Sequence, residues 1–391
     1  MKLENVILKL NKTAYIGWEE VSIKRSIEEG VSSFELVLAD PDDDATDLLD
    51  IDPGDPVQVL YGKELLITGY IDEISVGGDA TTHGYRIRGR SRTKDLVDCS
   101  STETKQLKNQ SLSQLSNTLA KEYGIKVIVR GSEGKPIKDF QVEQNGESPF
   151  SAIQRLAERE KLVITDTPEG DLLLTNIGNG DTKNELKHYP GENTGILEYE
   201  RIRKEEGRYS KVVVKAQTKS DDNYYGKQNN QVLAERDDPD VRRNKVKIII
   251  ADSQMSQTEA QNRANWEAQS SAGKADTITY KVQGWFGSAD ELWRENQRVH
   301  VDDEYILAED YYVIGSVEYS INDGGTTATL TLNPPEAFEK EPEDEKEKNT
   351  GKSKRKSKDK AVVRKKGKNK TNTKETINDE EWRHIEVNAN K

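Results

Sequence analysis

The chain has 391 residues, which is enough for two to four domains that each bury a core of their own. Its net charge is −13, but residues 352–370 hold eleven Lys and Arg against one Asp, so this stretch carries +10 and the remainder −23. An acidic body argues against nucleic-acid binding by the folded part, because contacts to phosphates need Lys and Arg.

Residues 1–102 are predicted to form a first β-barrel module of short antiparallel strands. Within it, DPGDPVQVLYGKELLITGYIDEISVGGDATTHGYRIRGRS (52–91) alternates apolar and polar residues and is broken by glycines. Alternation with a period of two is typical of strands that bury one face. The pair Gly77-Gly78 predicts a hairpin turn, since glycine adopts positive φ without a clash at Cβ.

Residues 103–185 are predicted to form a small α/β insert. Ser111 can cap a helix with Gln114 three residues later and Gly124 at its end. Ser148 is a second N-cap, followed by proline at the tolerated first helical position. The hairpin LVITDTPEGDLLLTNIG follows the second helix, with its turn at 168–170.

The remaining folded part is predicted to contain two domains. Strands such as SKVVVKA and KVKIII place a β connecting domain at 186–256. A helix that begins at Ser256 and stops at Gly273 leads into a second β-barrel module at 257–340.

The second module repeats the order of motifs in the first. The corresponding positions are Val57 and Val299, Val59 and Val301, Gly69 and Gly315, the Gly-Gly turns at 77–78 and 324–325, and the strands at 32–41 and 276–285. Any two antiparallel modules share some of this patterning. The common order of the motifs nevertheless favours two copies of one small barrel or sandwich module.

Residues 341–391 are predicted to be a disordered charged tail, because they hold too few apolar side chains to offset the loss of chain entropy. We expect the tail to act as a loose tether toward acidic surfaces, with its only tryptophan as a docking anchor. The candidate partner contacts are Trp382, Lys354, Arg355, Lys356, Arg364, Lys365 and Lys366. An inert solubilising extension is the alternative.

Most patterns that carry catalysis or cofactor binding are absent from the sequence. It contains no G-x-S-x-G, no phosphate-binding glycine loop and no H-x-x-x-H pair. A pair of catalytic carboxylates needs only proximity in space, but with 71 acidic residues a solvated surface is favoured for any given pair. The four histidines, His83, His188, His300 and His384, are expected to be packing or exposed side chains. The acidic run DPDDDATD (40–47) lacks the Gly and terminal Glu of an EF-hand loop, so a polar loop is favoured over a Ca²⁺ site. We expect no catalytic, cofactor-binding or metal-binding residue.

Cysteine content and hydropathy limit the cellular compartments in which the protein is expected to fold and act. Cys99 is the only cysteine, which excludes an intrachain disulfide and fits folding in a reducing cytoplasm. No apolar run approaches the roughly 18–20 residues that span a bilayer, and MKLENVILKLNK lacks the pattern of a signal peptide. We therefore expect neither membrane insertion nor export by the general secretory route.

Three stretches resemble the baseplate hub proteins of contractile-tailed phages of the Mu type. They are GRSRTKDLVDCS (89–100), ESPFSAIQRLAEREKLVITDTPEGDLLLTN (147–176) and QNRANWEAQSSAGKADTITYKVQGW (261–285). The resemblance extends over roughly residues 1–340 and leaves out the basic tail. It is shared with the N-terminal half of the spike proteins of type VI secretion, and it implies a mainly β fold with an α+β insert and two similar barrels per chain.

On this resemblance, three chains form a ring of six similar modules that adapts a hexameric tail tube to a trimeric spike. The implied partners are two further copies, the spike, the tail tube and other baseplate proteins, with no small-molecule substrate. The implied location is the baseplate of the virion tail, assembled in the cytoplasm of the host bacterium. The alternatives are a tail-tip peptidoglycan hydrolase, for which no further globular segment remains, and a nucleic-acid-binding protein, which depends on residues 352–370 alone.

Overall fold

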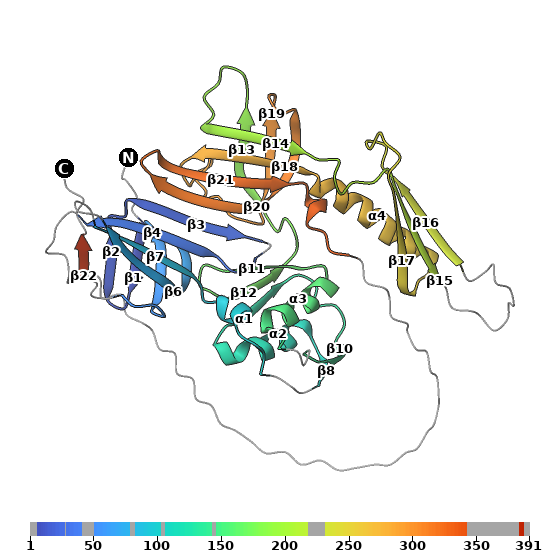
Figure 1. Cartoon of the computed structure of the whole chain (residues 1–391), viewed down its shortest axis with the longest axis horizontal. Coiled ribbons are helices and arrows are strands. Elements are labelled where there is room, and N and C mark those ends of the chain that lie inside the picture. The colour runs from blue at the N-terminus through green and yellow to red at the C-terminus, as the bar shows by residue number, and fades with distance from the viewer. Residues whose placement is uncertain are drawn as a thin grey trace, which may run out of the picture.

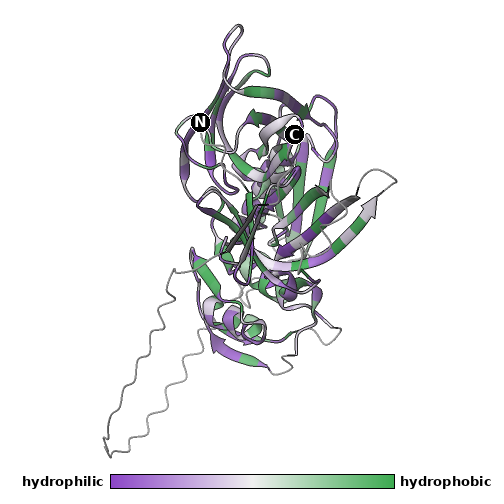
Figure 2. Cartoon of the chain, turned by 90° about the vertical axis from the view of Figure 1, so that its left-hand side faces the viewer, coloured by the Kyte–Doolittle hydropathy of each residue, from purple (hydrophilic) through white to green (hydrophobic). Residues whose placement is uncertain are grey.

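The computed structural model describes residues 6–27, 29–40, 51–78, 83–102, 106–142, 146–217, 231–341 and 383–386. Within them the protein is built mainly from antiparallel strands, with a smaller α/β part beside the main sheet (Figure 1). Apolar and polar residues alternate along many of the strands (Figure 2), because each of these strands buries one face. The predicted fold class, mainly β with an α+β insert, is confirmed. No helix in these ranges is long and apolar enough to cross a membrane.

Two runs of four strands have the same order and the same lengths. The first run is β4 (Ser33–Asp40), β5 (Pro56–Tyr61), β6 (Glu64–Gly78) and β7 (His83–Ser91). The second run is β18 (Asp276–Gln283), β19 (Arg298–Asp303), β20 (Ala308–Asn322) and β21 (Gly325–Asn333). The lengths are 8, 6, 15 and 9 residues in both runs.

The pairing within the two runs is also the same. The long strand pairs with the six-residue strand along its first half and with the nine-residue strand along its second half. The nine-residue strand then pairs with the eight-residue strand. The predicted duplication is therefore present at the level of whole strands.

The two glycines matched in the sequence do not occupy equivalent positions. Gly69 lies opposite Val57 in the β5–β6 hairpin, where a Cβ atom would meet the backbone carbonyl of Arg90. Gly315 is instead the unpaired residue of a bulge in β20, a place that Asp72 takes in β6. The predicted match is wrong at this residue, because the position opposite the first valine of the V-x-V pair is Gly69 in the first run and Tyr312 in the second.

Both runs belong to one continuous sheet of 14 described strands. β3 (Glu20–Ser26) pairs with β4 on one side and with the second half of β20 on the other. The sheet is extended by β1 (Val6–Leu10) and β2 (Thr13–Ile16) beside the first run, and by β13 (Asp181–His188) and β14 (Ile196–Arg203) beside the second. A single hydrophobic cluster holds buried side chains of both runs. The two modules are thus fused rather than separate bodies.

The α/β insert has its own hydrophobic cluster and follows the predicted helix signals. α2 (Leu112–Ala120) begins after Ser111, which forms a reciprocal capping box with Gln114. α3 (Pro149–Arg159) begins after Ser148, whose side chain accepts a hydrogen bond from the N–H of Ser151. Both predicted caps are confirmed. The other elements are α1 (Lys94–Asp98), β8 (Leu107–Gln110), β9 (Val127–Arg130), β10 (Ile137–Phe140), β11 (Val163–Asp166) and β12 (Leu172–Thr175).

A three-stranded sheet covered by one helix forms a third part. β15 (Lys211–Gln217) lies between β16 (Gln231–Asp237) and β17 (Val246–Gln254), and α4 (Gln257–Lys274) packs its alanines on one face. Gly273, the predicted stop, lies inside the last turn of α4, where a Cβ atom would meet the backbone of Ala337. Glycine here allows the chain to return close to the helix.

These contacts favour domain limits that differ from the predicted ones. α4 packs with the strands between 211 and 254, on the far side of the predicted limit at 256. β13 and β14 pair with β19 and β18, and so adjoin the second run rather than a connecting domain. The division into domains stays a prediction.

The predicted disordered tail lies almost entirely outside the described residues. Within it the structure describes Glu341 and the strand β22 (Arg383–Glu386). The backbone of β22 pairs in parallel with β2, at the outer edge of the main sheet. At these four residues the structure has a strand where disorder was predicted.

Candidate functional site

The partner contacts predicted in the tail lie outside the described residues. This applies to Trp382, Lys354, Arg355, Lys356, Arg364, Lys365 and Lys366. The strand β22, directly after Trp382, is the nearest described segment. The role of these side chains stays a prediction, and the candidate site must be sought elsewhere.

The joint between the two modules is the first feature that connects distant parts of the chain. Six residue pairs, from Ser26 with Ser316 to Val21 with Ile321, connect β3 and β20 in an antiparallel ladder. Its inner face is apolar, because Ile23 of β3 lies opposite Tyr319 of β20 and both are fully buried. The ladder continues the hydrogen-bond network of one module into the other.

A buried arginine ties three parts of the chain together beside this ladder. Arg25 of β3 is 1% exposed. Its Nη1 donates to the carbonyl oxygen of Leu66 in β6 at 2.7 Å, and its Nη2 donates to the carbonyl oxygen of Asp166 in β11 at 2.7 Å. Its Nε and Nη2 donate to the carboxylate of Glu295, just before β19, at 3.0 and 2.8 Å. One side chain therefore binds the first module, the insert and the second module.

The charges of this cluster compensate one another inside the protein. Burial acts to lower the pKa of Arg25, but the attraction of Glu295 and Asp166 outweighs it and holds that pKa above its ordinary value. Burial acts to raise the pKa of Glu295, but Arg25 outweighs it and holds that pKa below its ordinary value. Burial raises the pKa of Asp166, whose Oδ1 accepts a hydrogen bond from the hydroxyl of Ser32 at 2.6 Å. The cluster is thus an ion pair with a second carboxyl group beside it.

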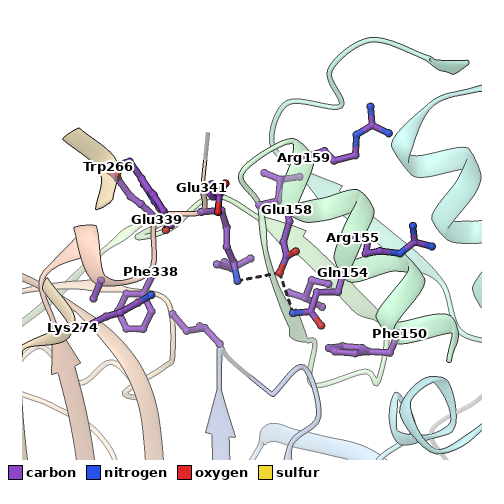
Figure 3. A pocket seen from close by; sticks show the side chains of 16 residues that line it. Phe150, Gln154, Arg155, Glu158, Arg159, Trp266, Lys274, Phe338, Glu339 and Glu341 are labelled. Atoms are coloured by element: carbon purple, nitrogen blue, oxygen red, sulfur yellow. Dashed lines mark hydrogen bonds and ion pairs between the residues drawn. The ribbon is translucent and has the colours of Figure 1, made fainter. Parts of the chain in front are cut away.

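A cleft of about 890 Å³ lies between α3 and the chain that follows the short 3-10 helix Pro335–Ala337 (Figure 3). Glu158 of α3 lies 3.6 Å from the ammonium group of Lys340 and accepts a hydrogen bond from Gln154 at 3.1 Å. The indole N–H of Trp266 donates to the carbonyl oxygen of Glu339 at 2.9 Å. The contacts to Lys340 and Glu339 hold the end of the folded chain against α3 and α4.

The described histidine side chains have packing positions. His188 Nδ1 lies 3.1 Å from Asp303 Oδ2, and the hydroxyl of Tyr280 donates to the same carboxylate oxygen at 2.8 Å. The ring of His300 lies against a tyrosine ring. In the described ranges, no group of three His, Cys, Asp or Glu side chains is arranged to hold a metal ion. The acidic run predicted as a polar loop lies outside those ranges beyond Asp40.

Sequence reasoning missed both the Arg25 cluster and the cleft. Asp166 and Glu295 lie 141 and 270 residues from Arg25 in the chain. The only local signal for it is a charged residue at an inward position of a strand, since Arg25 follows Val21 and Ile23 with a period of two. That signal marks a buried charge without naming its partner.

Family models of phage baseplate proteins match three parts of the chain. Residues 5–91 match the N-terminal domain of the Mu phage baseplate assembly protein GpP-like family. Residues 93–176 match the second domain of the baseplate hub protein gp44-like family. Residues 256–341 match the fourth domain of the Mu phage baseplate assembly protein GpP.

Whole proteins are similar over most of the chain. The baseplate hub protein gp44 of Escherichia phage Mu is 28% identical over 342 residues, which cover 85% of this chain and 88% of that protein. The crystal structure of the 43 kDa tail protein of prophage MuSo2 from Shewanella oneidensis is 30% identical, with a TM-score of 0.75, and the match covers 87% of this chain and 100% of that one. A type VI secretion component from E. coli shares the fold at 10% identity, with a TM-score of 0.50, over 84% of this chain and 76% of that one.

The duplicated sheet and its fused joint define a protein made of two similar β modules. The chain belongs to the family of baseplate hub proteins of contractile-tailed, Mu-type phages. The resemblance noted in the sequence is confirmed. Its relatives are named as tail and baseplate proteins.

Proposed function

We propose that three copies of this chain form a closed ring of six similar modules, which adapts a hexameric tail tube to a trimeric membrane-piercing spike. The observation that carries the proposal is the repeated run of strands of 8, 6, 15 and 9 residues, fused at one joint. A ring needs a contact that repeats around it, and two similar modules offer similar edges twice per chain. Three chains then present six modules to the tube and three protomers to the spike.

The partners in this proposal are two further copies, the tail spike, the tail tube and other baseplate proteins. The location is the baseplate of the virion tail, after assembly in the cytoplasm of the host bacterium. The name of the phage Mu relative, a baseplate hub protein, supports this placement. The type VI secretion component is described as similar in structure to the T4 tail proteins gp27 and gp5, which supports a place among tail proteins.

We also propose that the protein acts without catalysis. The relatives carry the names of structural tail parts. The buried ionisable groups of the joint bond to one another and are closed to a substrate. Release of peptidoglycan fragments by the purified protein, abolished by replacing one carboxylate, would instead favour a tail-tip hydrolase.

Light scattering on the purified full chain tests the ring. We expect a mass three times that of the 44.1 kDa chain, and particles with a central channel in electron micrographs. The ring contacts join strands and apolar side chains, so the mass should hold at both low and high salt. A monodisperse monomer at micromolar concentration would contradict the proposal.

A further inference from the structure

The β3–β20 joint has a counterpart in the second run, where the strand equivalent to β3 is paired on one side only. β3 pairs with β4 on one side and with Ser316–Ile321 of β20 on the other. In the second run the counterpart of β3 is β14, which pairs with β18, the counterpart of β4. β14 ends the sheet and has no further pairing with a described strand. One edge of β14 is therefore open in the described part of the chain.

The surface that would receive such a strand is also open. β5 covers β6 from residue 64 to residue 70, and residues 73–78 pair with β7 alone among the described strands. These residues correspond to the segment of β20 that receives β3. Val76 in this segment is 62% exposed, whereas Tyr319, at the matching position of β20, is fully buried under the joint. Tyr199 and Ile202 of β14 are likewise 43% and 38% exposed.

We propose that β14 of one copy pairs antiparallel with residues 73–78 of β6 in a neighbouring copy, so that the contact between copies repeats the β3–β20 joint. This inference rests on the proposed ring and names the edges that close it. β14 lies above the joint and β6 below it in Figure 1, so the two edges form a head-to-tail contact rather than a two-fold dimer. An open strand edge invites uncontrolled association, and ring closure removes both edges at once.

The bulges define the register of this contact. Where they pair with the nine-residue strand, β6 and β20 each carry a bulge, at Asp72 and at Gly315. We align the long strands on these bulges, and align β14 with β3 through their pairing with β18 and β4. The alignment places Ser75 opposite Ile202 of the next copy.

Two residues along the same ladder, a pair of side chains with opposite charges supports this register. Glu73 then lies opposite Lys204, a pair of opposite sign. The position of Ser75 and Ile202 is taken in the chain's own joint by another pair of opposite sign, Glu318 and Lys24. The two joints therefore use the same ladder with different side chains.

Disulfide cross-linking tests the register directly. The full chain with Cys99→Ser carries Ser75→Cys and Ile202→Cys. Directly opposed residues of an antiparallel pair have Cα atoms about 4.5–5.5 Å apart, within the range of a disulfide. We expect covalent dimers and trimers on non-reducing gels, which a reductant converts to the single chain. The control replaces Ile202→Cys by Glu198→Cys, four residues away on β14, and should give roughly tenfold less product because its Cα atom lies beyond disulfide range.

A charged side chain introduced at the open edge of β6 tests the contact between copies without cysteine substitutions. Val76→Glu should convert the trimer to the single chain while leaving the circular dichroism spectrum unchanged, because this side chain is already exposed in the isolated chain. The matched control is Ile250→Glu on β17, where the side chain is 77% exposed, and it should keep the trimer.

The outcomes separate the contact from the ring. If the wild-type chain is a trimer but Val76→Glu stays trimeric and the cysteines do not cross-link, the proposed contact is wrong and the ring stands. Loss of the trimer in Ile250→Glu alone would place the contact on β17 and overturn the proposal. A monomeric wild-type chain would overturn the contact and the ring together.

Discussion

Replacing Arg25 by methionine tests whether the buried cluster holds the modules and the insert together. Methionine fills a similar volume but donates no hydrogen bond, so five hydrogen bonds are lost, to Leu66, Asp166 and Glu295. Removing one partner of a buried ion pair costs about 3–5 kcal/mol, because the other charge stays buried without compensation. We expect the free energy of unfolding to fall by about that amount.

Guanidinium unfolding followed by tryptophan fluorescence measures this loss, since Trp285 and Trp293 are buried in the cluster shared by both modules. The control is Arg298→Met, which removes a 2.7 Å ion pair with Asp181 at the surface and should change little, because exposed pairs are screened by water.

A double variant sharpens the test of the ion pair. Arg25→Met with Glu295→Met should recover part of the loss, because no unpaired carboxylate of Glu295 then remains buried. A fall of less than about 1 kcal/mol for Arg25→Met alone would refute the view that this cluster holds the joint.

Three further predictions follow from the same structure. The pKa of Glu295 is held low in the folded protein, so its stabilising effect should be complete above the unfolded pKa of about 4.3 and disappear as the pH falls through the lower folded pKa. From pH 7 to pH 2 the unfolding midpoint should therefore fall less in Glu295→Gln than in the wild-type chain. The same fall in both chains would contradict this assignment. Gly69→Ala should lower the free energy of unfolding by about 1–3 kcal/mol, because its Cβ atom meets the carbonyl of Arg90. Gly84→Ala, whose Cβ atom makes ordinary contacts only, should unfold at nearly the wild-type midpoint. Similar losses in both variants would show that the close approach of Arg90 is not the cause. Removing residues 342–391 should leave the protein trimeric but weaken capture of the spike at low salt, because the basic stretch at 352–370 carries +10. At high salt the difference in capture should shrink, because ions screen this charge. Unchanged capture would leave the tail without a role in that contact.

The sequence by itself determined the local elements and the repeated plan. The caps at Ser111 and Ser148 were read correctly because a cap needs only a side-chain oxygen and the backbone N–H groups two or three residues away. The strands were visible because alternation of apolar and polar residues reports one buried face, whatever lies against it. The order of strands in the two runs follows from the same local pattern. The resemblance to the baseplate hub family depends instead on the three stretches at 89–100, 147–176 and 261–285.

Only the tertiary structure decided how these elements meet. An alternating strand fits many registers, and turn length and bulges select one, which is why Gly69 and Gly315 looked equivalent in the sequence and are not. Gly273 looked like a helix stop, but the return of the chain onto α4 decides its role. The partners of Arg25 depend on three segments that approach one another only after folding, because a buried charge is stable only where opposite charges and carbonyl groups converge on it.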